Sequence, residues 1–130
     1  MPQLEKGGKW VFGWIMVNQY LKFQVPPDGY DEYGFMTDQE LAYTNGSHRS
    51  GGFGVSKLEI LATNEFMAKR IITKTTMGRN GQITLPAEIG IKPEPLLLAV
   101  RGSKYALGFL LKGPIVEAVL LHPEIEVFTV

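Results

Sequence analysis

The sequence predicts a mainly β protein, a pseudo-twofold β-barrel with one connecting α-helix and short helical turns. Short apolar segments rich in aromatic and β-branched residues alternate with turns rich in glycine and proline, which is typical of β proteins. The order of these segments occurs twice along the chain. Because neither copy can bury its apolar face alone, we expect the copies to interlock and close a barrel without edge strands.

The composition fits a single domain, 1–130, with 45% hydrophobic and 20% charged residues. The chain has no cysteine, which excludes disulfides, thiolate catalysis and zinc–thiolate sites. No apolar run is long enough to span a membrane, and the polar N-terminus lacks the apolar core of a signal peptide. We therefore expect a cytoplasmic protein without a membrane partner.

The charge is balanced overall but uneven along the chain. Residues 1–66 hold five basic and eight acidic side chains, whereas residues 67–130 hold eight and five. The formal net charge of zero argues against a constitutive nucleic-acid binder, because such binding relies on neutralising phosphates. The asymmetry either orients a partner or reflects two solvated faces of a neutral protein.

The first two predicted strands are Lys9–Val17, which is mostly apolar, and Tyr20–Val25, which alternates apolar and polar residues. Trp10, Phe12 and Trp14 share one face of an alternating strand, so we expect them in the barrel core, together with Phe53 and Phe109. A platform for single-stranded nucleic acid has the same pattern. The low charge of the segment favours the core.

The rest of the first half contains a helical turn, a strand, a glycine-rich loop and a helix. Pro26 and Pro27 end the second strand, because proline cannot donate to a ladder. The helix is predicted over 57–68, because Ser56 and Glu59 match the capping box before a helically spaced apolar run. The other elements are a helical turn over Pro27–Gly34, a strand over Glu40–Thr44 and a loop over Asn45–Gly54.

The second half has the same kinds of element. Its predicted strands are Ala68–Thr76, Gln82–Leu85, Leu96–Val100 and Leu107–Leu111. Turns are expected at Gly78–Gly81 and Arg101–Tyr105. A short helical turn over Val116–Leu121 and a final strand over Ile125–Val130 complete the chain.

An internal repeat relates residues 9–57 to residues 69–113. Phe23 aligns with Ile83 and Pro26 with Pro86; the second copy then lacks four residues, and Leu41 aligns with Leu97. The pattern Gly-Ser, four residues, Gly-Phe begins at Gly46 and again at Gly102. We therefore expect two pseudo-twofold units, joined by the helix at about 57–68 and followed by a C-terminal extension, 114–130.

The segment Gly81-Gln-Ile-Thr-Leu-Pro-Ala-Glu-Ile89, followed by Gly90-Ile-Lys-Pro-Glu94, resembles the core of the AbrB/MazE/SpoVT swapped-hairpin superfamily. The resemblance covers 70–112 and, through the repeat, 9–57. Members of that superfamily carry one copy per chain and dimerise. This chain therefore looks like a fused dimer, similar to a swapped-hairpin or RIFT-type barrel, acting as a monomer or a homodimer.

The family implies DNA-binding regulators and antitoxins. By that resemblance the expected phosphate contacts are Lys69, Arg70, Lys74 and Arg79. Two departures oppose DNA: the helix after Pro86 is short and lacks arginine, and the first copy carries acidic residues there. These acidic residues are Asp28, Asp31 and Glu32.

A second hypothesis is a binding module for a small anion or a protein partner. Backbone N–H groups, hydroxyls and a guanidinium gather in the first glycine-rich loop, which is the chemistry of an oxyanion nest. The residues are Gly46, Ser47, His48, Arg49 and Ser50, with Arg101, Ser103 and Lys104 in the other copy. An ordinary polar hairpin has the same composition, and the loop does not match a P-loop.

Nothing in the sequence demands an enzyme. Ser47 and His48 are neighbours on the chain and would point to opposite faces of a strand, so they do not form a nucleophile–base pair. The acidic turn lacks EF-hand spacing. We therefore expect a non-enzymatic regulatory or binding module without a cofactor or a metal, with DNA, a small anion or a protein as the possible partner.

Overall fold

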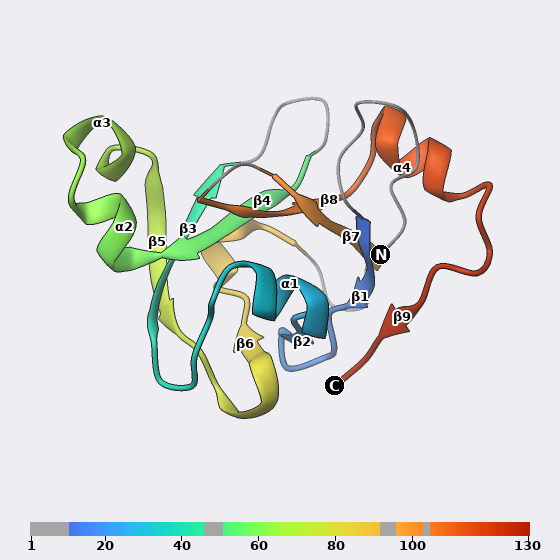
Figure 1. The fold of residues 1–130 in the computed structure, drawn as a ribbon, viewed down its shortest axis with the longest axis horizontal. Coiled ribbons are helices and arrows are strands. Elements are labelled where there is room, and N and C mark those ends of the chain that lie inside the picture. The colour runs from blue at the N-terminus through green and yellow to red at the C-terminus, as the bar shows by residue number, and fades with distance from the viewer. Residues whose placement is uncertain (1–10, 46–50, 92–95, 103–104) are drawn as a thin grey trace.

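The computed structural model describes residues 11–45, 51–91, 96–102 and 105–130 (Figure 1). Its strands follow the predicted segments closely, and most begin and end within a few residues of the expected limits. The strands are β1 Val11–Met16, β2 Lys22–Gln24, β3 Glu40–Asn45, β4 Phe53–Lys57, β5 Ile71–Thr76, β6 Gln82–Thr84, β7 Leu96–Arg101, β8 Leu107–Leu110 and β9 Val127–Phe128.

The helices are all short. The helical turn predicted over Pro27–Gly34 is present, and the one predicted over Val116–Leu121 begins and ends two residues earlier, at Pro114–Val119. Both helices carry proline in the first turn. The α-helices are α1 Pro27–Glu32, α2 Leu58–Ala62, α3 Glu65–Ala68 and α4 Pro114–Val119, and the 3₁₀ helices are η1 Arg79–Gly81 and η2 Ala87–Ile89. No described helix is long and apolar enough to cross a membrane.

The described strands form one open sheet and one small ribbon, so the predicted closed barrel is wrong. The seven-stranded sheet has the order β5-β3-β4-β8-β7-β1-β9, and β2 pairs with β6 separately. Pro26 and Pro86 follow the ribbon strands almost at once, and a proline cannot donate to a ladder. The ribbon pairs three residues of each strand and is separate from the seven-stranded sheet.

The pairing partners in one half of the sheet correspond to those in the other. In the antiparallel pair of β1 and β7, Trp14 faces Leu98 and Ile15 faces Leu97. The residues of β5 and β3 that align with them form equivalent pairs. Each of the two strand pairs also has a bulge at the aligned position. These aligned pairs are Lys74 with Ala42 and Thr75 with Leu41.

Two further pairs join aligned residues directly. Phe53 of β4 faces Phe109 of β8, and Phe23 of β2 faces Ile83 of β6. The rings of Phe53 and Phe109 stack with centroids 4.9 Å apart, and Phe23 meets the Phe109 ring edge-on at 5.2 Å. Such aromatic pairs add stability beyond the area they bury. The contact between the two halves is therefore centred on these rings.

The core consists of two clusters on opposite faces of the sheet. The larger cluster lies between the sheet and the β2–β6 ribbon and contains all three of these phenylalanines. The smaller cluster joins β1 and β7 to Val116 and Val119 of α4. In β7, Leu97 belongs to the first cluster and Leu98 to the second. Burial on both faces explains why this strand has almost no polar residue.

A bulge in β1 changes the predicted positions of its aromatic residues. The register shifts between Val11 and Gly13, so Phe12 lies in the larger core cluster, whereas Trp14 is half-buried against the smaller one. The prediction that these two residues share a face is therefore wrong, because a bulge inserts one residue into the alternation. Trp10 lies outside the described residues, and Phe53 and Phe109 are buried as predicted.

The predicted helix over 57–68 is two helices, α2 and α3. Asn64 breaks it with an extended backbone, and its Oδ1 accepts hydrogen bonds from the backbone N–H groups of Phe66 and Met67. Ser56 is not a helix cap: it lies in β4 opposite Ala42, and its buried hydroxyl has no hydrogen-bond partner among the described residues. Strand pairing therefore outweighs the local capping motif.

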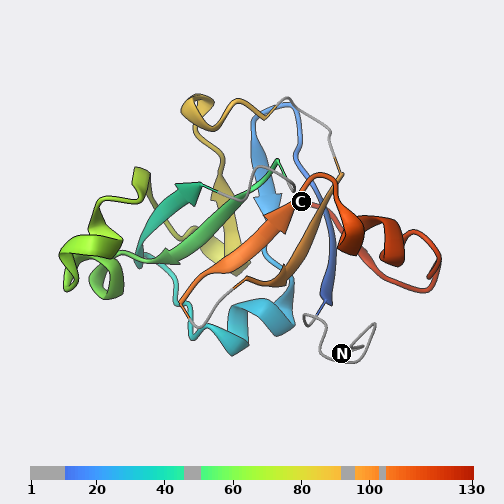
Figure 2. The same cartoon turned by 90° about the horizontal axis from the view of Figure 1, so that it is seen from above.

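The two ends of the sheet carry different additions. At one end α4 leads to β9, which pairs in parallel with β1; this strand has two residues instead of the predicted six. At the other end α2 and α3 lead to β5. Figures 1 and 2 agree that α2 and α3 lie at one end of the molecule and α4 at the opposite end.

Candidate binding surface

Three of the four predicted phosphate contacts lie together. Lys69 caps the C-terminus of α3, Arg70 follows it, and Lys74 lies in the middle of β5; all three are exposed. Arg79 is also exposed but belongs to η1, beyond the opposite end of β5. A strand of six residues spans about 20 Å, so Arg79 is well separated from Arg70.

β5 is an edge strand: among the described strands it pairs only with β3. An open groove of about 700 Å³ runs beside it. The groove touches four consecutive residues of the strand, Ile71–Lys74, together with residues of α2 and α3. The lining residues are Leu58, Ala62, Ala68, Ile71, Ile72, Thr73 and Lys74.

Ile72 gives this groove an apolar wall that sequence reasoning missed. It is 37% exposed, whereas its aligned residue Phe12 is only 6% exposed. Phe12 packs under α1, where a Cβ placed on Gly29 would lie 3.4 Å from the Phe12 ring. The four residues missing after Pro86 reduce the corresponding helix to η2, which has only three residues. The four-residue gap in the repeat is the sequence feature from which the exposure of Ile72 could have been predicted.

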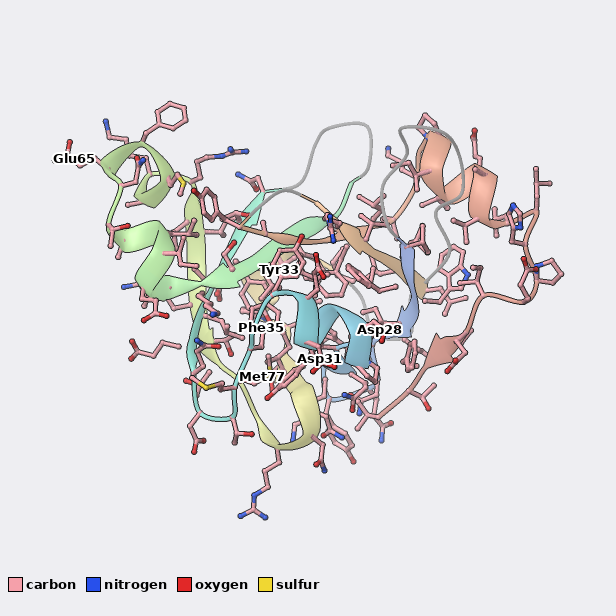
Figure 3. All side chains as sticks on the ribbon, in the orientation of Figure 1. Asp28, Asp31, Tyr33, Phe35, Glu65 and Met77 are labelled. Atoms are coloured by element: carbon pink, nitrogen blue, oxygen red, sulfur yellow. The ribbon has the colours of Figure 1, made fainter. Side chains whose placement is uncertain are left out.

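Among the described residues, Lys69, Arg70 and Lys74 form no ion pair with a carboxylate. Along the chain the nearest acidic side chains are Glu59 of α2 and Glu65 of α3, and Figure 3 shows Glu65 at the outer end of the molecule. On the neighbouring strand β3, the exposed Glu40 faces Thr76 and is the diagonal neighbour of Lys74. From 68 to 74 the chain carries three cations and no carboxylate. We call Lys69–Lys74, with its groove, the β5 edge.

The predicted anion nest lies mostly outside the described residues. This applies to Gly46, Ser47, His48, Arg49 and Ser50 and to Ser103 and Lys104. Arg101 is described at the end of β7, and its guanidinium donates to the Glu32 carboxylate in an ion pair. An anion at Arg101 would therefore compete with a carboxylate that the fold already supplies.

The acidic turn forms α1. Figure 3 shows Asp28 and Asp31 on this helix, and Glu32 pairs with Arg101. Among the described residues no cluster of three or more histidine and carboxylate side chains could hold a metal ion. The histidine that the structure describes is His122, and its Nδ1 lies 3.0 Å from Glu124 Oε1. A hydrogen bond to the backbone of Glu124 itself lowers the pKa of this carboxyl most, and the side-chain hydrogen bond with His122 lowers it further.

Tyr43 is the most deeply buried titratable side chain described, and its role is structural. Its hydroxyl donates a hydrogen bond of 2.7 Å to the Thr84 carbonyl, which joins β3 to the end of β6. Burial raises the pKa of this hydroxyl well above its usual value, so it stays protonated and keeps donating. The ring meets that of Phe53 edge-on in the core.

Comparison of this chain with known protein families, curated proteins and solved structures finds no match.

Proposed function

We propose that this chain is a non-enzymatic regulatory binding module of the AbrB-like swapped-hairpin type, and that the β5 edge is its contact surface for an anionic partner. The observation that carries the proposal is the position of Lys69, Arg70 and Lys74 at a sheet edge where, among the described residues, no further strand pairs and none of the three forms an ion pair. Cations gathered on one surface attract anionic partners and steer their approach.

The strand pairing supports the swapped-hairpin part of the proposal. Each half supplies the strands that complete the other, since β1 pairs with β7 and β5 pairs with β3. The aligned registers match, and the two central pairs, Phe53 with Phe109 and Phe23 with Ile83, join aligned residues. A fused dimer of interlocked copies has this arrangement, here in an open sheet rather than a barrel.

Duplex DNA is the partner that the family resemblance implies, through Lys69, Arg70, Lys74 and Arg79. The residues aligned with Lys74 and Arg79 are Trp14 and Gln19, so the chain carries one basic hairpin and not two. Four phosphate contacts release few counterions, and the logarithm of the binding constant would then fall with a slope of about −3 to −4 against the logarithm of salt. Any DNA binding would therefore be weak at physiological salt.

A mobility-shift titration with genomic fragments at low salt tests this form of the proposal. Binding through the β5 edge is expected to weaken in Lys69→Ala and Lys74→Ala, each lowering the salt slope by about one. Lys112→Ala, an exposed lysine beyond β8, is the matched control and should leave binding unchanged. The absence of any shift at low salt would remove DNA as the partner.

A protein partner is the second candidate, and the groove beside β5 favours it. Apolar side chains such as Leu58, Ile71 and Ile72 line the groove, and they match apolar side chains better than a phosphate backbone. The small-anion alternative rests on loop residues outside the described part of the chain, apart from Arg101, which is paired with Glu32.

A further inference from the structure

We propose that the β5 edge docks an extended segment of a partner protein in which apolar and acidic residues alternate. The inference rests on the proposed function, because it names the partner of the same basic surface. The segment adds to the sheet as a strand parallel to β5, its carboxylates lie beside Lys69, Arg70 and Lys74, and its apolar side chains fill the groove. Strand addition at a sheet edge is a common mode of peptide recognition.

The molecule itself provides a precedent at the opposite end of the sheet. There β9 lies parallel to β1, with Val127 beside Trp14 and Phe128 beside Ile15, and the backbone N–H of Trp14 donates to the Glu126 carbonyl at 2.8 Å. The two paired residues are both apolar, and glutamate alternates with apolar residues over 124–127, where the chain leads into them. β1 is the strand that aligns with β5, so the same kind of segment fits the β5 edge.

The aligned registers define the backbone contact. Trp14 and Lys74 are aligned residues, and each faces its partner strand in an equivalent pair, with Leu98 and Ala42 respectively. Because Trp14 directs its N–H to β9, the same register directs the N–H of Lys74 to the β5 edge. A docked strand therefore finds a backbone donor beside the lysine side chain, where it can also place a carboxylate.

The side chains of the edge select the partner. Ile72 and the apolar wall of the groove require apolar residues, and three exposed cations require carboxylates. A second copy fits poorly, because antiparallel pairing of two β5 strands about Lys74 would bring like charges opposite each other. Nucleic acid would satisfy the cations but not the apolar wall. The alternating acidic peptide satisfies both.

The test measures fluorescence polarisation of a labelled synthetic peptide with the sequence of residues 123–130, titrated with the full chain. We expect saturable binding that weakens about fivefold to tenfold in Lys74→Glu and is unchanged in the matched control Lys112→Glu. A peptide with lysine in place of both glutamates should lose the binding. Ile72→Ser should weaken the interaction, whereas Leu121→Ser, at an exposed leucine beyond α4, should not.

Backbone N-methylation of the peptide tests strand addition without altering the protein. Two peptides, each methylated on the backbone N–H groups of one edge, should differ in affinity, because only one edge of the docked strand faces β5. Methylation of the edge that faces β5 should weaken binding about tenfold, and methylation of the other edge should have little effect. Amide hydrogen exchange should show new protection within 71–76 when the peptide binds. Equal effects of the two methylations would contradict parallel or antiparallel strand addition.

The remaining outcomes separate this inference from the proposed function. Peptide binding that Lys74→Glu leaves unchanged, or no peptide binding at all, overturns the inference. If duplex DNA then binds with sensitivity to Lys74→Glu, the proposed function stands and the surface belongs to nucleic acid. If the chain sediments as a dimer that Ile72→Ser dissociates, the edge belongs to a second copy. If neither peptide nor DNA binds, both proposals fail.

Discussion

The two ends of the seven-stranded sheet are built from aligned strands but are completed differently. At the β1 end, α4 and β9 cover both a face and the edge, and Trp14 packs against them. At the β5 end, α2 and α3 flank the strand, and no strand in the described part of the chain pairs with its outer edge. Figure 2 shows these ends on opposite sides of the shared centre. Aligned pairing therefore determines the centre of the molecule, while residues outside the aligned pairs determine which edge is covered.

The largest effects are expected at the shared centre, where the two halves should respond alike. Phe53→Ala and Phe109→Ala each remove a buried ring from the same stacked pair, so each should lower the free energy of unfolding by about 3–5 kcal/mol. Urea unfolding of both single variants and the double variant measures this. Because the rings touch, the double variant should lose less than the sum; strict additivity would contradict a single shared contact.

The next effect should distinguish the two ends. Gly13 has a φ of 134°, and a Cβ there would lie 2.7 Å from the Phe128 ring, so Gly13→Ala both strains the backbone and pushes β9 away. We expect a loss of about 2 kcal/mol in the free energy of unfolding. Among the described strands, none pairs with the outer edge of β5 at Thr73, the aligned residue. Thr73→Ala should therefore cost about 0.5 kcal/mol or less, and equal losses would contradict the asymmetry.

A smaller effect is expected in the helices beside the β5 edge. Asn64→Ala removes the side chain that caps α3 and should lower the free energy of unfolding by about 1 kcal/mol. Ser56→Ala should be neutral or stabilising, because the hydroxyl is buried without a partner. Thermal unfolding of both variants compares them. A loss in Ser56→Ala as large as that in Asn64→Ala would restore Ser56 as the cap.

These residues also show what sequence could and could not predict. The strands and the short helices after proline were predictable, because alternation, β-branched residues and proline act locally. Ser56 was misassigned because a capping motif competes with strand pairing that only the tertiary structure reveals. The bulge at Gly13 and the open sheet depend on contacts between distant residues. The sequence predicted Lys69, Arg70 and Lys74 as candidate contacts, which stay a prediction, whereas the groove beside them depends on how α2, α3 and Ile72 lie in the tertiary structure.

The smallest effect concerns pH at the covered end, where Glu124 precedes β9. Its pKa is lower in the folded chain, so its contribution to stability is present above the unfolded pKa and is lost as pH falls through the folded value. Glu124→Gln should therefore be slightly less stable than the parent chain near neutral pH and equal to it in acid. Urea unfolding from about pH 7 to about pH 3 follows this window. A difference that grows in acid would show that the carboxyl is not stabilised in its charged form, and that β9 is held on β1 by its backbone and apolar contacts alone.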